Sequence, residues 1–172
     1  MSLSQASVPS FEIGLNALSA ILVKGEDFAS TKDIEPLVLL NTRLYPNMFP
    51  LIRQVQGAAD QAKNAAARLA GVDPPRFEDK ETTFAELKDR ISRTISFIKT
   101  LEAHKIDAAA SKEITFPLGS TIKGHMKGAD YLNYFALPNF YFHLTTAFAI
   151  LRHCGVDIGK EDFLGALPIK LS

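Results

Sequence analysis

Four long segments of the chain carry apolar residues at helical spacing. They cover residues 8–28, 47–70, 83–101 and 139–154. In the first segment, Phe11, Leu15, Leu18 and Leu22 lie three or four residues apart, so their side chains share one face of a helix. Four amphipathic helices of this length bury their apolar stripes against one another. The sequence therefore predicts an all-α fold, a four-helix bundle, and its 172 residues suit a single domain over 1–172.

Start and stop signals predict where these helices begin and end. Pro9 is expected in the first turn of the first helix, where its missing N–H costs nothing, and the run 24–27 weakens or ends that helix. Asn47 is expected to cap the second helix and Gly71 to end it. Residues 83–86, Thr-Phe-Ala-Glu, form a capping-box pattern that predicts the start of the third helix.

The period changes before the last helix. Segments 113–118 and 120–123 alternate around Gly119, which predicts a small β-hairpin. Residues 128–136 are expected to form a preliminary turn or helix, and Leu137–Pro138 to break the chain, with Pro138 in the first turn of the last helix. Two further short elements are expected, a helix over 37–43 and a tail over 162–165 that packs back.

Charge and cysteine content exclude several classes of protein. The 19 basic and 19 acidic residues give no net charge, whereas a protein that binds a phosphate backbone carries a basic excess, so no nucleic-acid partner is expected. The single cysteine, Cys154, cannot form an internal disulfide, and the N-terminus lacks the basic and apolar regions of a secretory signal. These features predict a cytoplasmic protein. The charged residues of the third helix are expected on a solvated face: Lys88, Asp89, Arg90 and Arg93.

One stretch resembles a membrane span by length. Residues 131–151 contain no charge and are long enough to cross a bilayer. They include Asn133, Asn139 and His143, which are costly in hydrocarbon, and no other segment resembles a span. We therefore expect a buried helix and no membrane partner. The aromatic residues of this stretch are expected in the core.

Chemistry-bearing motifs are scarce. The chain has no Gly-x-Ser-x-Gly elbow, P-loop, Gly-x-Gly-x-x-Gly loop or Cys-x-x-Cys pair, and it lacks the Glu-x-x-His pair of di-iron bundles. His104 is expected to be solvated near a helix end, and His153 to interact with the dipole of the last helix. His125, in the hairpin region, and the thiol of Cys154 are weaker candidates for a site.

One polar constellation remains. Asn139 and His143 are four residues apart and share a face of the last helix. On the second helix, either Gln54 or Gln56 could point a carboxamide inward, and Asp60 lies one to two turns further along. An imidazole enclosed by carboxamides can bind a small polar ligand, transfer a proton or hold a metal weakly. The alternative is a core histidine whose ring is hydrogen-bonded to Asn139, a threonine or a main-chain carbonyl.

Two runs near the C-terminus carry a family resemblance. They are residues 137–143, Leu-Pro-Asn-Phe-Tyr-Phe-His, and residues 150–155, Ile-Leu-Arg-His-Cys-Gly, supported by 48–51, 68–71 and 159–165. The sequence resembles the domain-of-unknown-function family DUF1993 over nearly its whole length. That family looks like a branch of the DinB-like superfamily of four-helix bundles. The resemblance implies a protein that is often a dimer, in a superfamily whose members are often regarded as metalloenzymes; some characterised branches are thiol-dependent transferases or isomerases.

The resemblance also assigns positions to a metal triad, which in the superfamily is one histidine on the second helix and a His-x3-His pair on the fourth. The second histidine of the pair precedes a Leu-Arg pair by eight and nine residues and a glycine by about twelve. His143 has these intervals here, so the first position falls on Asn139 and the second-helix position on Gln54, with Gln56 as the other choice.

Neutral carboxamides are poor ligands for zinc or nickel. The degenerate Gln/Asn/His triad therefore implies a metal-free bundle that either is structural or binds a small molecule. The residues expected to bind it are Gln54, Gln56, Asn139 and His143. No cofactor is expected, and a divalent metal is the less favoured alternative. The alternative is an enzyme, similar to the thiol-dependent transferases or isomerases and with or without a metal, that acts on a small polar substrate with His143 as its acid–base. A homodimer is expected in either case.

Overall fold

The computed structural model describes residues 1–119 and 121–169. The described chain is mostly helical with one small antiparallel sheet. Its elements are α1 (Leu3–Thr31), α2 (Pro36–Leu40), α3 (Leu51–Ala70), α4 (Phe84–Lys99), α5 (Ala103–Asp107), β1 (Glu113–Leu118), β2 (Ile122–Lys127), α6 (Gly128–Asp130), the π-helix η1 (Tyr131–Ala136), α7 (Leu137–His153) and α8 (Lys160–Leu164).

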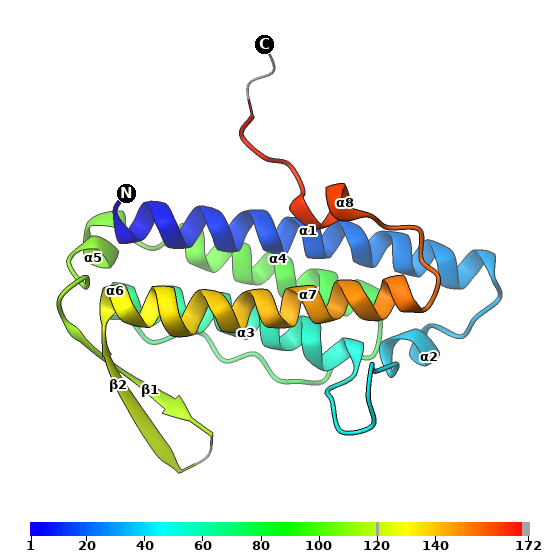
Figure 1. The fold of residues 1–172 in the computed structure, drawn as a ribbon, viewed down its shortest axis with the longest axis horizontal. Coiled ribbons are helices and arrows are strands. Elements are labelled where there is room, and N and C mark those ends of the chain that lie inside the picture. The colour runs from blue at the N-terminus through cyan, green and yellow to red at the C-terminus, as the bar shows by residue number, and fades with distance from the viewer. Residues whose placement is uncertain (120, 170–172) are drawn as a thin grey trace.

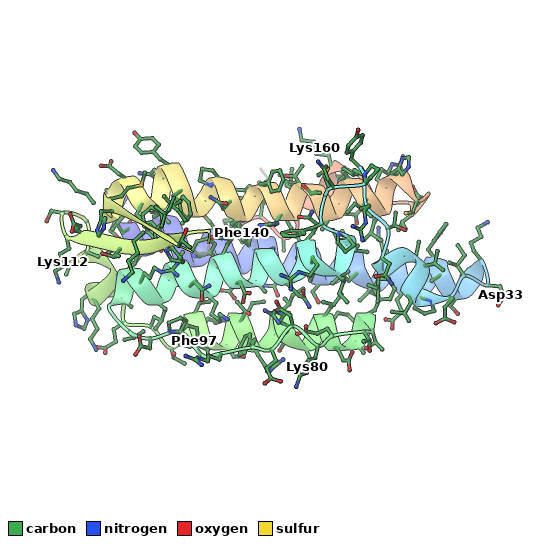
Figure 2. The ribbon with its side chains drawn as sticks, turned by 90° about the horizontal axis from the view of Figure 1, so that it is seen from below. Asp33, Lys80, Phe97, Lys112, Phe140 and Lys160 are labelled. Atoms are coloured by element: carbon green, nitrogen blue, oxygen red, sulfur yellow. The ribbon has the colours of Figure 1, made fainter. Side chains whose placement is uncertain are left out.

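The four long helices lie side by side. Helix α7 packs beside α3, α3 beside α4, α4 beside α1, and α1 beside α7, an arrangement that Figures 1 and 2 show from two directions. The connector 71–83 returns along the length of the molecule, so α3 and α4 run in the same direction (Figure 1). Their facing sides form the core, which includes Leu15, Val55, Ile91 and Phe140. The predicted stripes are therefore the buried faces.

Helix α1 is longer at both ends than predicted. Ser2 caps it in a capping box with Gln5, so Pro9 lies inside the helix and not in its first turn. At the other end Gly25 does not stop the helix, which continues to Thr31. A Cβ at Gly25 would lie 3.0 Å from Leu151, so this glycine permits a close approach to α7. The predicted start was wrong because the capping box at Ser2 begins the helix before Pro9, and the predicted end was wrong because Gly25 packs against α7.

Helices α3 and α4 test the capping predictions. The N-cap of α3 is Pro50 and not Asn47, and no side chain makes a cap hydrogen bond at this end of the helix. Gly71 ends α3 in the left-handed conformation, with φ of 70°, as predicted. The capping box of α4 is also confirmed, because the Thr83 hydroxyl accepts the Glu86 N–H and the Glu86 carboxylate accepts the Thr83 N–H.

The hairpin is present and its second strand is longer than predicted. Strands β1 and β2 pair antiparallel with Thr115 opposite His125, and β2 continues to Lys127. Ser120, which the prediction placed in the second strand, lies outside the described residues.

The break expected at Leu137–Pro138 is absent. Elements α6, η1 and α7 follow one another without interruption, and Ala136 and Leu137 both have helical dihedral angles. Pro138 lies in the first turn of α7, as predicted, where its missing N–H is tolerated, and the Leu137 N–H before it donates to the Leu132 carbonyl at the end of the π-helical turn.

The C-terminal segment packs back as expected. The Phe163 ring of α8 lies edge-on to Phe148, with centroids 5.7 Å apart, and Lys24 pairs with Asp162 at 2.7 Å.

Within the described residues, α1 is the one helix whose length and mean hydropathy would suit a membrane span. The expectation that no segment other than 131–151 resembles a span was therefore wrong. Residues of α1 from Phe11 to Ala29 contribute to the core.

Candidate functional site

His143 and Gln54 meet across the contact between α7 and α3. The His143 Nδ1 lies 2.8 Å from the Gln54 Oε1. Gln54 is only 1% exposed, whereas His143 is half-buried, so the ring has one side toward the helices and one side toward solvent. Residues 89 positions apart in the sequence thus form one polar pair. The structure brings together Gln54 and His143 from the predicted set.

A second hydrogen bond determines which end of the Gln54 carboxamide faces the histidine. The Gln54 Nε2 donates to the main-chain carbonyl of Phe49 at 3.0 Å. Because a carbonyl only accepts, that end of the side chain is the NH2 group, and Oε1 faces His143. Since Oε1 has no hydrogen, the His143 Nδ1 carries the proton and donates it. Neutral His143 is therefore the Nδ1–H tautomer, and its Nε2 keeps a lone pair.

Gly57 determines how closely the imidazole approaches α3. A Cβ at this position would lie 2.9 Å from the His143 Cε1 and Nδ1 atoms. The ring therefore rests against the main chain of α3, one turn beyond Gln54, at a place where any side chain would collide with it. Gly57 and the Phe49 carbonyl are site elements that the sequence analysis missed. The alanine-rich run that follows Gly57 allows close helix packing, but nothing in it indicates which side chain fills the space.

The surroundings of His143 favour its neutral form. Burial lowers its pKa below the ordinary value, and the negative charge of Asp60 offsets that effect only in part. At pH 7 the ring is therefore uncharged. With Nδ1–H donated to Gln54, the Nε2 atom is available to accept a hydrogen bond, to take a proton or to bind a metal.

Asn139 lies one turn before His143 on α7, as predicted. Its Nδ2 donates to the main-chain carbonyl of Phe135 at 2.7 Å, which fixes the amide against the end of the π-helical turn. This bond leaves the Asn139 Oδ1 as the acceptor of the side chain. Asn139 is half-buried and makes no hydrogen bond to His143 within the described residues.

Gln56 does not face this site. Its Nε2 donates to the Glu81 Oε2 at 2.8 Å and its Oε1 accepts from Arg53 at 2.9 Å, on the side of α3 that packs against α4. Asp60 is also turned that way, since its Oδ1 accepts from Lys63 at 2.9 Å and from Arg90 at 3.0 Å. Gln56 was predicted as a possible site residue, but its contacts with Glu81 and Arg53 give it a structural role instead.

Gln56 and Asp60 belong to a buried ionic network centred on Arg90. The Arg90 guanidinium has no exposed surface and pairs with Asp60 and Asp79 at 3.0 Å and with Glu81 at 2.9 Å. Two of these carboxylates come from the connector 71–83, so the network fastens that connector to α3 and α4. The expectation that Arg90 belongs to a solvated face was wrong, because the connector covers that part of α4.

The aromatic residues of 131–148 are divided between core and surface. Tyr131 and Phe140 are buried, as expected, but Tyr134 is 72% exposed and Phe142 is 56% exposed. The Phe142 ring stands edge-on to the His143 ring, with centroids 5.4 Å apart. Phe49, whose carbonyl holds Gln54, is also exposed. The solvent side of His143 is therefore bordered by exposed aromatic surface.

The remaining candidates lie apart from His143. His104 is exposed near Glu102, His125 contacts the Thr115 hydroxyl at 3.2 Å on the hairpin, His153 is exposed in the last turn of α7, and Cys154 is half-buried. None of these contacts brings the four residues into one cluster. Within the described part of the chain, no group of three or more His, Cys, Asp and Glu residues is arranged to hold a metal ion.

Comparison with known proteins gives the family. Residues 3–164 match the family model described as "Domain of unknown function (DUF1993)". The chain belongs to the DUF1993 family. A crystal structure of a DinB family member protein from Shewanella denitrificans is similar, with 41% sequence identity and a TM-score of 0.91 over 99% of this chain and 96% of that chain. Among curated proteins, none matches.

These findings confirm the resemblance to DUF1993 and agree with a DinB-like branch. In this DUF1993 protein, the three positions that the resemblance assigns to a metal triad hold Gln54, Asn139 and His143. Two neutral carboxamides and one imidazole make a donor set that suits hydrogen bonding better than a transition metal.

Proposed function

We propose that this DUF1993 protein is a metal-free binding protein for a small polar molecule. In this proposal Gln54, Asn139 and His143 form the site, and no cofactor is required. The observation that supports it best is the fixed tautomer of His143, whose Nδ1–H is donated to Gln54. A ligand that donates a hydrogen bond would be accepted by the His143 Nε2, and the Asn139 Oδ1 supplies a second acceptor.

An enzyme is the second candidate, favoured by the same Nε2 atom. A neutral histidine whose ring is held by a second side chain can act as a general base, because its free nitrogen carries a lone pair in a fixed orientation. In this reading His143 takes a proton from a thiol or another small polar substrate, as in a thiol-dependent transferase or isomerase, with Gln54 and Asn139 as positioning residues. A divalent metal bound at the Nε2 would belong to this candidate.

Metal analysis tests the metal-free part of the proposal and separates it from a metal-dependent enzyme. Untagged protein and the His143→Ala variant would be exposed to zinc, nickel and manganese, passed over a desalting column and assayed for bound metal. We expect no stoichiometric metal in either protein. Near-stoichiometric metal in the wild type that is lost in His143→Ala would contradict the metal-free proposal and favour the enzyme. A screen of small polar compounds by NMR would follow, with His153→Ala as the matched control on the same helix.

We also propose that the four long helices form a four-helix bundle of the DinB type and that the protein is a homodimer of the cytoplasm. The exposed side of η1 and α7 favours the dimer, since Tyr134, Tyr141 and Phe142 are exposed and residues 131–151 contain no charge. A second copy could cover this face without burying an unpaired charge.

The dimer proposal predicts a change of mass on substitution. Light scattering should give twice the chain mass for the wild type and the monomer mass for a Tyr134→Lys/Tyr141→Lys double variant, because the added charges would meet at the two-fold interface. Val38→Lys, at an exposed apolar position on α2, should remain dimeric. A monomeric wild type at high concentration would contradict the proposal.

A further inference from the structure

A second candidate binding site lies at the far end of α3 from His143. A cavity of about 320 Å³ opens between the last turn of α3, helix α5 and the segment 108–114. Four basic residues line it: Arg68, His104, Lys105 and Lys112. Figure 2 shows Lys112 at the end of the molecule where β1 begins. Arg68 and Gln54 are fourteen residues apart on α3, so the two sites are separated by roughly 21 Å along the helix.

The cavity has a surplus of positive charge in a chain whose net charge is zero. Lys105 is ion-paired with Glu102. Glu113 is the acidic lining residue, and its carboxylate is largely exposed and 3.5 Å from the His125 ring. Within the described residues, Arg68 and Lys112 have no carboxylate within ion-pair distance. Among the described residues, Arg68 and Lys112 are therefore two cations of this cavity without an ion-pair partner, and Glu113 is the one carboxylate that lines it.

The Arg68 side chain is oriented before any ligand binds. Its guanidinium donates to the Tyr131 hydroxyl at 3.0 Å, and Tyr131 is fully buried. Burial raises the pKa of Tyr131, an effect that the positive charge and the hydrogen bond of Arg68 only partly offset. The phenol is therefore neutral at pH 7 and positions Arg68 without compensating its charge. The remaining N–H groups of the guanidinium stay available for an anion.

The segment that carries Lys112 is also fixed. The Gly128 N–H donates to the Lys112 carbonyl at 2.9 Å, and the Ala129 N–H donates to the Ala110 carbonyl at 3.1 Å. A Cβ at Gly128 would lie 2.2 Å from the Ala109 carbonyl oxygen, so only glycine allows this close approach. The main chain beneath Lys112 is thus held against α6, and the lysine extends from a rigid base.

We propose that this cavity binds a small phosphate monoester. A dianionic phosphate matches the two unpaired cations, and the planar guanidinium of Arg68 can bind two of its oxygens. The inner wall is apolar, since Leu69, Ala109 and Ile114 are all buried. An apolar wall beside the cations favours an ester with a short apolar body over free inorganic phosphate.

Calorimetric titration with phenyl phosphate at low salt tests the proposal. We expect saturable one-to-one binding that is at least tenfold weaker for inorganic phosphate and absent for phenol. Lys112→Gln, at an exposed side chain, should weaken phenyl phosphate binding about tenfold, and Arg68→Gln should weaken it at least as much. Lys123→Gln, an exposed lysine on β2, is the matched control and should leave binding unchanged.

Three outcomes would overturn the proposal. They are no saturable binding by the wild type, equal losses in Lys112→Gln and Lys123→Gln, and equal affinity for inorganic phosphate and the ester. His143→Ala serves as a further control, because a ligand that binds at the His143 site would be lost in that variant while binding at Arg68 would be retained.

Discussion

Replacing Arg90 with methionine, a side chain of similar length without charge, is expected to lower the free energy of unfolding by about 3–5 kcal/mol. The Arg90 guanidinium is fully buried and pairs with Asp60, Asp79 and Glu81 at 2.9–3.0 Å. Without it, the Glu81 carboxylate stays buried and loses its cationic partner, while the hydrogen bond from Gln56 remains. Urea unfolding of the variant and the wild type at pH 7, followed by circular dichroism, measures the difference.

Arg93→Met is the matched control on the same helix. Arg93 is half exposed and pairs with Asp89 on the surface, so its loss should change the free energy of unfolding by less than about 1 kcal/mol. Similar losses in both variants would show that the Arg90 network does not behave as a buried one.

The pH dependence of the free energy of unfolding, compared between the wild type and Arg90→Met, gives an independent check. Burial raises the pKa of Glu81, but the hydrogen bonds from Arg90, from the Glu81 main chain and from Gln56, together with the positive charge of Arg90, lower it overall below its ordinary value of 4.5. As the pH falls, the Glu81 carboxylate therefore takes up a proton in the unfolded chain before it does so in the folded chain. Glu81 thus contributes stability above pH 4.5, and this contribution is lost as the pH falls further. In Arg90→Met the pKa of Glu81 rises, so this contribution should shrink and the gap between variant and wild type should narrow in acid.

This network could not be predicted from the sequence. Asp79 and Glu81 belong to a connector without helical or strand periodicity, and nothing local indicates that it runs back over α4. Arg90 lies between the apolar stripe positions of its helix, where a charged residue is normally solvated. Its burial follows from the path of the connector, which is a tertiary property.

The candidate site was predicted more completely, for a physical reason. Asn139 and His143 share a helix face whatever the tertiary structure, because their spacing of four residues determines it. Gln54 and Gln56 are about 200° apart around α3, so only one of them can face α7. The choice depends on how α3 is rotated against its neighbours, and the structure turns Gln54 toward His143 and Gln56 toward Glu81.

Helix ends show the same division between local and tertiary causes. The capping box of α4 and the C-terminal glycine of α3 were predicted because their hydrogen bonds lie within a few residues. The continuation of α1 through Gly25 was not, because that glycine is used for contact with Leu151 and Phe84. A glycine in a helix is ambiguous until its packing partner is known.

Gly57 provides the sharpest test of that point. In an exposed helix interior, replacing glycine with alanine raises stability by about 1 kcal/mol, because alanine has the higher helix propensity. Here we expect the opposite sign, a loss of about 1–3 kcal/mol, because the new Cβ would lie 2.9 Å from the His143 ring. The ring must move away from α3, which lengthens the 2.8 Å hydrogen bond to Gln54.

A double-mutant cycle assigns the cause. In the His143→Ala background the ring is absent, so Gly57→Ala should become neutral or stabilising, and the two substitutions should be strongly non-additive. Nitrogen-detected NMR of the imidazole supplies a second readout, since the wild type should show the Nδ1–H tautomer and Gly57→Ala should lose it. If Gly57→Ala destabilises the protein equally in both backgrounds, the imidazole does not rest on α3, and the oriented Nε2 on which the proposed ligand site depends would be lost with it.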